Sequence, residues 1–314
     1  MKHKKIIIAG GKGFIGTYFA KAFAALDYQV IILTRHPSQA AHRSVEYVYW
    51  DGVTEGDWTH VFEGAEAVIN LSGRSVDCRY HEKNRQEILN SRIHSTQLIG
   101  RVIHQTQNKP NVWINASSAT IYADTRGNRP ANTESNGTIG DDFSMGVCKA
   151  WEHTFNEIET LGVRKLILRM AIVLGADGGA LKPLRRLTQL GLGGRMGSGE
   201  QFMSWIHIED LLQIVLHIIE DDSLQGAFNC ASPNPVTNAT FMRALRTQKR
   251  MPFGIPTPAS LLKIGALLIR TETELILKSR KVYPERMLNA GFQFQYDDLE
   301  NALSNLINPT NKRK

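Results

Sequence analysis

The chain has few cysteines and no long apolar run. Its three cysteines, Cys78, Cys148 and Cys230, lie far apart and form no CxxC pair, so neither a zinc site nor a disulfide framework is indicated. The apolar stretch 261–269 contains a lysine and is far shorter than the roughly 20 residues of a membrane-spanning helix. The apolar run 6–9 is too short for a secretory signal. These absences predict a cytoplasmic protein with no metal and no membrane contact.

An excess of positive charge is also missing once the two ends are set aside. The formal net charge of the 314 residues is +7, but six basic residues lie at the ends. These residues are Lys2, Lys4, Lys5, Lys312, Arg313 and Lys314, and without them the chain is close to neutral. No basic stripe with interleaved aromatic residues is present, so we expect solvated tails and no nucleic-acid partner.

What is present is a regular alternation of strand and helix patterns through the first half of the chain. Strands are predicted at residues 5–9, 29–34, 45–50, 65–71, 112–117 and 164–170. Helices are predicted at residues 14–26, 82–104 and 141–160. This alternation indicates an α/β fold with a Rossmann-type, doubly wound parallel sheet. Ligands of such sheets lie at the carboxyl ends of the strands, at the point where the strand order reverses.

The first predicted strand runs directly into a glycine-rich turn with GxxGxxG spacing. The turn consists of Gly10, Gly11, Lys12, Gly13, Phe14, Ile15 and Gly16. Its glycines permit a tight bend, a close approach of the backbone to a pyrophosphate, and close packing of helix on strand. The following helix directs free N–H groups and a positive dipole end at the phosphates. Strand, turn and helix together predict a dinucleotide-binding site.

The second strand ends in Thr34 and Arg35, where an NAD-binding protein usually has an acidic residue for the ribose 2′-hydroxyl. No acid is present, and a guanidinium can form a bidentate pair with a 2′-phosphate. The alternative is a surface arginine with no role in binding. We therefore expect NADP(H) as the cofactor.

The pattern changes after residue 174. Residues 1–174 are predicted to form the dinucleotide-binding domain, and residues 175–309 a smaller C-terminal α/β substrate-binding part that is partly interleaved with it. Residues 310–314 form a basic tail. The glycine-rich segment 175–199 is expected to be mobile or a lid. Helices are expected after residues 233–237, at 256–269 and at 299–307.

Several motifs together resemble a known family. Asn70, Leu71, Ser72 and Gly73 follow the fourth strand, and residues 117–122 follow the fifth. Further matching segments are residues 168–175, 197–201, 204–210, 235–238, 280–284 and 290–292. With the glycine turn, they resemble an atypical branch of the extended short-chain dehydrogenase/reductase superfamily. This "epimerase family" branch includes bacterial proteins described as nucleoside-diphosphate-sugar epimerases. The resemblance implies that residues 70–73 help to bind the cofactor.

The superfamily's reaction centre is a serine, a tyrosine and a lysine, with three residues between the last two. By resemblance, Ser118 would hold the substrate oxygen, and Lys149 would bind the nicotinamide ribose. Four positions before Lys149 stands Met145, which cannot exchange a proton. Tyr122 and His207 are candidate replacements for the tyrosine, and packing is the alternative role of each.

Neighbouring residues have simpler expected roles. Cys148 is expected to be a buried helix residue and not a nucleophile, because no base is placed beside it. Trp151 is expected in the core, and Glu152 on the surface or at a cap. Asp210 is expected to complement a helix dipole, and the alternative, implied by the resemblance, is that the stretch from His207 to Asp210 lies on the substrate side of the cleft.

Two functions remain from the sequence. One is an NADP(H)-binding oxidoreductase or epimerase with an atypical active site, acting on a small polar substrate. The alternative, motivated by Met145, is a catalytically silent NADP(H)-binding sensor or regulatory protein. A homodimer is an open possibility for either function.

Overall fold

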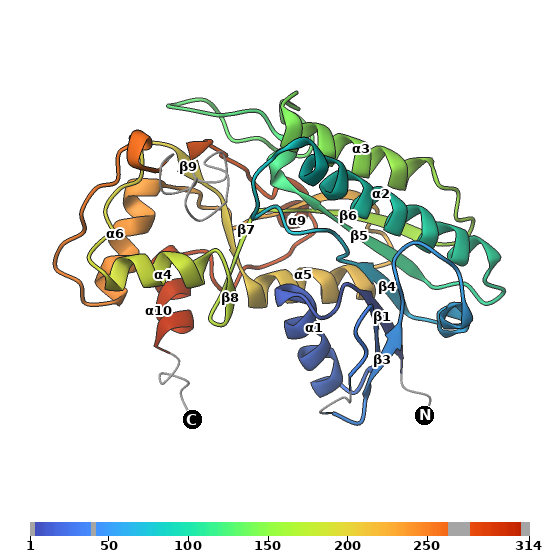
Figure 1. Cartoon of the computed structure of the whole chain (residues 1–314). Coiled ribbons are helices and arrows are strands. Elements are labelled where there is room, and N and C mark those ends of the chain that lie inside the picture. Colours follow the sequence, from blue (N-terminus) through green and yellow to red (C-terminus); the bar gives the residue numbers. More distant parts are fainter. Residues whose placement is uncertain (1–3, 39–41, 263–276, 309–314) are drawn as a thin grey trace.

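A computed structural model describes residues 4–38, 42–262 and 277–308, and its centre is a seven-stranded parallel sheet (Figure 1). The strands are β1 (Lys5–Ala9), β2 (Gln29–Thr34), β3 (Val45–Tyr49), β4 (Ala67–Asn70), β5 (Val112–Ser118), β6 (Arg164–Met170) and β11 (Gly226–Cys230). They lie in the order β11-β6-β5-β4-β1-β2-β3, and each neighbouring pair is parallel. This arrangement confirms the predicted Rossmann-type fold.

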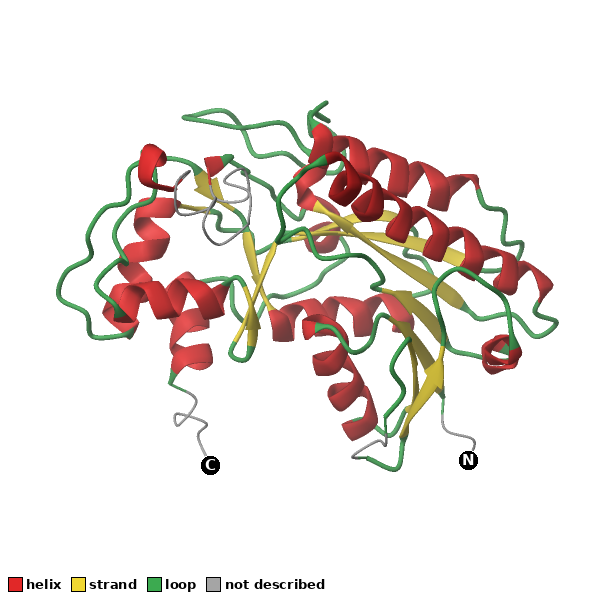
Figure 2. Ribbon diagram, in the orientation of Figure 1, coloured by secondary structure: helices red, strands yellow, loops and turns green. Residues whose placement is uncertain are grey.

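Helices cover both faces of the sheet (Figure 2). Helices α1 (Phe14–Ala25) and α5 (Ile208–Glu220) pack on one face, and α2 (Glu82–Gln105), α3 (Phe143–Glu157) and the 3-10 turn η1 (Asp57–Phe62) pack on the other. The apolar strands supply both layers because their side chains alternate between the faces.

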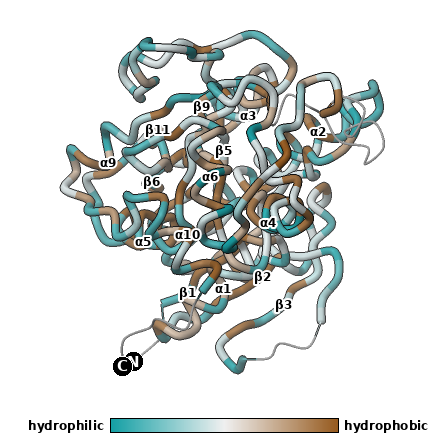
Figure 3. Tube along the Cα trace, turned by 90° about the vertical axis from the view of Figure 1, so that its left-hand side faces the viewer, coloured by the Kyte–Doolittle hydropathy of each residue, from teal (hydrophilic) through white to brown (hydrophobic). Residues whose placement is uncertain are grey.

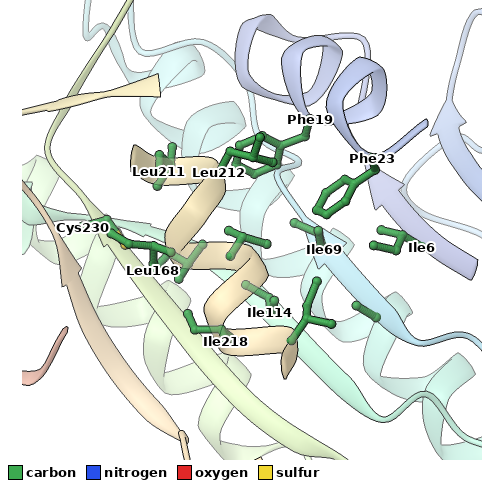
Figure 4. Packing of buried hydrophobic residues seen from close by; sticks show 14 of the residues in the cluster. Ile6, Phe19, Phe23, Ile69, Ile114, Leu168, Leu211, Leu212, Ile218 and Cys230 are labelled. Carbon is green, nitrogen blue, oxygen red and sulfur yellow. The ribbon is translucent and has the colours of Figure 1, made fainter. Parts of the chain in front are cut away.

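Strand β1 shows how the two layers form. Ile6 and Ile8 belong to the cluster with α1 and α5, whereas Ile7 belongs to the cluster with α2 and α3. Figure 4 shows Ile6 beside Phe23 of α1 in the first of these layers. Hydrophobic segments accordingly concentrate in the interior of the chain trace, and hydrophilic ones at its periphery (Figure 3).

The strand order reverses between β1 and β4. From β1 the chain continues to β2 and β3 on one side, and the later strands extend the sheet on the other side. The two strand ends are in close contact there, since a Cβ atom on Gly10 would lie 2.9 Å from the carbonyl oxygen of Leu71. Gly10 also has a φ of +76°, which favours glycine. The glycine turn therefore lies at the predicted ligand-binding edge.

The second half of the chain forms a lobe beside the sheet (Figure 1). Its strands are β7 (Ile172–Gly175), β8 (Gly178–Gly179), β9 (Phe202–Met203), β10 (Trp205–His207) and β12 (Val236–Thr237). Its helices are α4 (Leu181–Gln189), α6 (Asn238–Gln248) and α10 (Leu299–Ile307), whereas α9 (Glu285–Asn289) packs on β11 of the central sheet. Strand β11 comes from this half of the sequence but completes the central sheet.

Residues 175–199, expected to be a mobile segment or lid, contain the end of the β7–β8 hairpin and α4. The glycines of the hairpin serve close packing: a Cβ on Gly178 would lie 2.3 Å from the ring of Phe14. Helix α6 begins as predicted, with the Thr237 hydroxyl accepting from the Thr240 N–H at 3.3 Å. Of the helix expected at 256–269, residues 259–262 are helical and residues 256–258 are not, and residues 263–269 and the tail 310–314 lie outside the described residues.

Candidate active site

A cavity of about 320 Å³ opens at the carboxyl ends of the central strands, where the strand order reverses. Its walls are the glycine turn, the segments that follow β4 and β5, the end of β6, and one face each of α2 and α3. We call it the switch-point cavity. Its position agrees with the general rule for ligand sites in doubly wound sheets. In the described ranges, no three His, Cys, Asp or Glu side chains group as a metal site, and no helix could cross a membrane.

The glycine turn forms one wall of the cavity through Gly10, Gly13, Ile15 and Gly16. Helix α1 begins at this wall, its N-cap Gly13 makes no side-chain hydrogen bond, and its first turn has no acidic residue. The first N–H groups of the helix therefore have no side-chain acceptor at the cap and suit an anionic ligand.

Two cations, Lys12 and Arg35, lie near the carboxyl end of β2. Only Arg35 was expected there from the sequence. The ammonium of Lys12 donates to the carbonyl of His36 at 2.9 Å and lies 5.6 Å from the ring centroid of Tyr47. Arg35 is exposed directly after Thr34. A phosphate bound beside them would meet positive charge and no carboxylate from the end of β2.

Asn70 holds the backbone of the segment that follows β4. It is fully buried, its amide donates to Asn115 Oδ1 at 2.8 Å, and its Oδ1 accepts from the Ser72 N–H at 3.0 Å. Leu71, Ser72 and Gly73 then line the cavity. Asn70 thus shapes the segment whose later residues face a ligand.

Ser118 lies at the end of β5 and lines the cavity. Its hydroxyl donates to Thr120 Oγ1 at 2.9 Å and accepts from the Thr120 N–H at 3.2 Å. Thr120 lines the cavity too. These two hydroxyls provide hydrogen-bonding groups for a polar ligand.

Helix α3 presents Ser144, Cys148 and Trp151 to the cavity. Their spacing of four and three places them on one face of the helix. Lys149 is not in the lining; its ammonium contacts Asp141 Oδ1 at 2.5 Å, and 42% of its side chain is exposed. Met145 is buried and also outside the lining. The Lys149 ammonium thus pairs with Asp141, whereas Ser118 lines the cavity.

Cys148 is buried as expected, and burial raises the pKa of its thiol to about 12. A thiol with this pKa stays protonated at neutral pH and is a poor nucleophile.

Tyr122 and His207, the candidate proton donors, both lie outside the lining of the cavity. The Tyr122 hydroxyl donates to Asn229 Oδ1 at 2.8 Å and accepts from Arg169 Nη1 at 2.9 Å, and burial raises its pKa. His207 caps α5 and stacks on Tyr296 with 3.8 Å between ring centroids. Burial lowers the pKa of His207 to about 4. Both side chains have packing and hydrogen-bonding roles where they stand.

A buried ion pair beneath the cavity was missed from the sequence. Glu152, expected on the surface or at a cap, is buried and accepts two hydrogen bonds from Arg169, at 2.9 and 2.7 Å. The hydroxyl of Ser117 also donates to Glu152, at 2.6 Å. The available clue was an arginine in the apolar strand β6, because a buried guanidinium needs a partner.

Family models match most of the chain. Residues 6–231 match the NAD dependent epimerase/dehydratase family, and residues 257–306 match a domain of unknown function, DUF1731. The chain is 34% identical over 313 residues to an epimerase family protein of Staphylococcus saprophyticus, covering 98% of this chain and 100% of the relative. It is 33% identical over 308 residues to the epimerase family protein YfhF of Bacillus subtilis, covering 96% and 97%.

Solved structures show the same similarity. The human epimerase family protein SDR39U1 (isoform 2), crystallised with NADPH, matches with a TM-score of 0.83 and 28% identity, over 96% of this chain and 99% of that one. A nucleoside-diphosphate sugar epimerase of Corynebacterium glutamicum matches with a TM-score of 0.76 and 26% identity, over 98% of this chain and 58% of that one.

The parallel sheet and the glycine turn at its reversal point define the class of Rossmann-fold dinucleotide-binding proteins. Within that class, the chain belongs to the NAD dependent epimerase/dehydratase family. The resemblance to the epimerase-family branch of the extended short-chain dehydrogenases/reductases is thereby confirmed.

Proposed function

We propose that the protein is an NADP(H)-dependent oxidoreductase or epimerase that acts on a small polar substrate in the switch-point cavity. The observation that carries this proposal is the shared cavity itself. It joins the glycine turn, which suits a pyrophosphate, to the hydroxyl of Ser118, which suits a reacting oxygen. A dinucleotide would supply the hydride, and the protein would bind and orient both partners.

NADP(H) is proposed over NAD(H) because of the charge at the end of β2. Lys12 and Arg35 would bind the 2′-phosphate, and Thr34 lies beside them. Residues 71–73 would line the path of the cofactor, with Asn70 holding their backbone. The NADPH found with the human relative is consistent with this preference.

Ser118 is proposed to hydrogen-bond the reacting oxygen of the substrate. Ser144 occupies the cavity-facing position on α3, with Cys148 one helical turn later. Lys149 and Tyr122 are not part of the proposed reaction centre, because both lie outside the cavity lining. No tyrosine or lysine from α3 replaces them, since the cavity-facing residues of this helix are Phe143, Ser144, Val147, Cys148 and Trp151.

Turnover tests the proposal. Purified protein with NADPH should oxidise the coenzyme in the presence of some member of a broad panel of aldehydes, ketones and keto-sugars. Ser118→Ala should lower kcat/KM by about 10-fold or more while leaving NADPH affinity unchanged, because the lost hydrogen bond is to the substrate. Bound NADPH that no carbonyl compound ever oxidises would argue against an enzyme.

Bound NADPH that is never oxidised would favour the alternative function, a sensor or regulator that binds NADP(H) without catalysis. The observation behind this alternative is the cavity face of α3, where neither a tyrosine nor a lysine is present. A sensor should respond to the oxidation state of its ligand. Hydrogen exchange in the segments that follow β4 and β5 should then differ between the NADPH and NADP⁺ complexes, and identical exchange would exclude redox sensing.

A further inference from the structure

Arg92 of α2 is the only charged residue among the described residues that line the switch-point cavity. Its guanidinium lies 5.1 Å from the ring centroid of Trp151 on α3. On another side it contacts Gly73, where a Cβ atom would lie only 3.1 Å from Arg92 Cζ. The charge is therefore held in the cavity wall between two of its elements.

The guanidinium of Arg92 has no carboxylate partner in the described part of the chain. Its Nη1 atom donates to the carbonyls of Ile88, at 2.8 Å, and Arg74, at 3.2 Å, and these are its hydrogen bonds. The ionisable neighbours that act on it are Cys148 and Tyr80, and burial lowers its pKa. Arginine nevertheless stays protonated at neutral pH.

Two other partly buried guanidiniums in the described part of the chain pair with carboxylates. Arg169 makes a bidentate pair with Glu152, and Arg164 lies 3.0 Å from a carboxylate oxygen of Asp222. Removing a cation from water without a counter-ion costs free energy. A ligand that carried negative charge into the cavity would offset this cost at Arg92.

We propose that Arg92 binds an oxyanion, a phosphate or carboxylate group, of the molecule that occupies the switch-point cavity. This inference rests on the proposed function in assuming that the cavity takes a dinucleotide and a polar substrate. Two sources can supply the oxyanion: the cofactor pyrophosphate, or an acidic group on the substrate.

The substrate is the source that we expect. The amide groups at the start of α1 are available for the pyrophosphate on the wall of the glycine turn. Arg92 contacts Gly73 on the proposed cofactor path, and its guanidinium faces the ring of Trp151 on α3, the helix that presents Ser144 and Cys148 to the cavity. The protein would then select substrates that carry a carboxylate or phosphate near the reacting carbon.

Arg92→Met tests the proposal, because methionine keeps an apolar stem against Trp151 and removes the charge. Arg92→Lys keeps the charge but not the bidentate geometry. Arg101→Met is the matched control: Arg101 lies on the same helix, is half exposed, and pairs with Glu55 at 3.3 Å. Circular dichroism and thermal melting establish that each variant is folded.

Two titrations distinguish the sources of the oxyanion. The first measures NADPH binding to ligand-free protein by calorimetry. The second measures binding of inorganic phosphate and of malonate to protein saturated with NADP⁺. We expect Arg92→Met to retain NADPH affinity within about twofold and to lose phosphate or malonate affinity by about 10-fold or more, while Arg101→Met matches the wild type.

A 10-fold loss of NADPH affinity in Arg92→Met would instead place the oxyanion on the cofactor and would still support the proposal. Wild-type behaviour of Arg92→Met in both titrations overturns it. If the wild type binds no NADPH, the proposed function fails, and the anion titration is run on the ligand-free protein. Phosphate or malonate binding that depends on Arg92 then supports the inference alone, and absence of such binding overturns it.

Discussion

At the scale of the residue, the glycine turn permits a sharp test. A Cβ atom on Gly16 would lie 2.5 Å from the backbone of Gly11, so a substitution there would disturb the fold. A Cβ on Gly13 meets only the carbonyl oxygen of Gly10, at 3.4 Å, an ordinary contact. Gly13→Val should therefore fold but fill the space that a pyrophosphate needs. We expect NADPH binding to be abolished in calorimetry, and wild-type affinity in a folded variant would refute the site.

Arg35 should set the choice of coenzyme. Arg35→Asp replaces a cation with an acid that repels a 2′-phosphate and accepts from a 2′-hydroxyl. The ratio of NADPH to NADH affinity should fall by about 10-fold or more, since hydrogen bonds between charged groups contribute about 1.5–3 kcal/mol. Arg43→Asp is the control. Arg43 is exposed and precedes the amino end of β3, whereas Arg35 follows the carboxyl end of the neighbouring parallel strand β2. An unchanged ratio in Arg35→Asp removes this residue from the account.

Some site residues could be predicted from the sequence because they follow directly from the order of strand, turn and helix. The glycine turn is of this kind, whereas Ser118 was expected from the family resemblance, and both line the cavity. The direction of Lys149 could not be predicted from spacing alone. One residue corresponds to about 100° around a helix, so Cys148 faces the cavity while Lys149 contacts Asp141.

At the scale of the element, α3 is fixed to the sheet by the pair Glu152–Arg169. The side chains are only 8% and 13% exposed, so removing one charge leaves the other buried without a partner. Glu152→Gln should lower the free energy of unfolding by about 3–5 kcal/mol. Glu157→Gln, on the exposed side of the same helix, should change it by less than about 0.5 kcal/mol. Equal denaturation midpoints for the two variants would contradict this role.

The long elements were predictable and the short ones were not. Strand β6 has the predicted bounds, and the predicted helix 82–104 ends one residue later in the structure, because long periodic patterns outweigh local ambiguity. Strands such as β8 and β12 have two residues each, which is too short for a period to be visible. Their positions depend on tertiary contacts, such as the packing of Phe14 against Gly178.

At the scale of the whole molecule, the second half of the chain contributes both to the central sheet and to the cavity. Strand β11 returns from the second lobe to complete the sheet, and Val173 of β7 lines the same cavity as the glycine turn. A ligand in this cavity should therefore stabilise the molecule against unfolding. At about 100 times its Kd, NADPH should add roughly 2.7 kcal/mol, measured as a rise in the melting temperature. The folded Gly13→Val variant should show no such rise, and an equal rise in both proteins would place the ligand elsewhere.

The proposed function requires that the amide groups at the start of α1 bind the phosphates of NADP(H). Isothermal titration calorimetry on ligand-stripped, full-length protein tests this claim most directly, with NADPH and NADH titrated separately. We expect saturable binding near one equivalent, with NADPH bound about 10-fold or more tightly than NADH because of the two cations near the end of β2. An absence of binding heat with both coenzymes at several temperatures would contradict it.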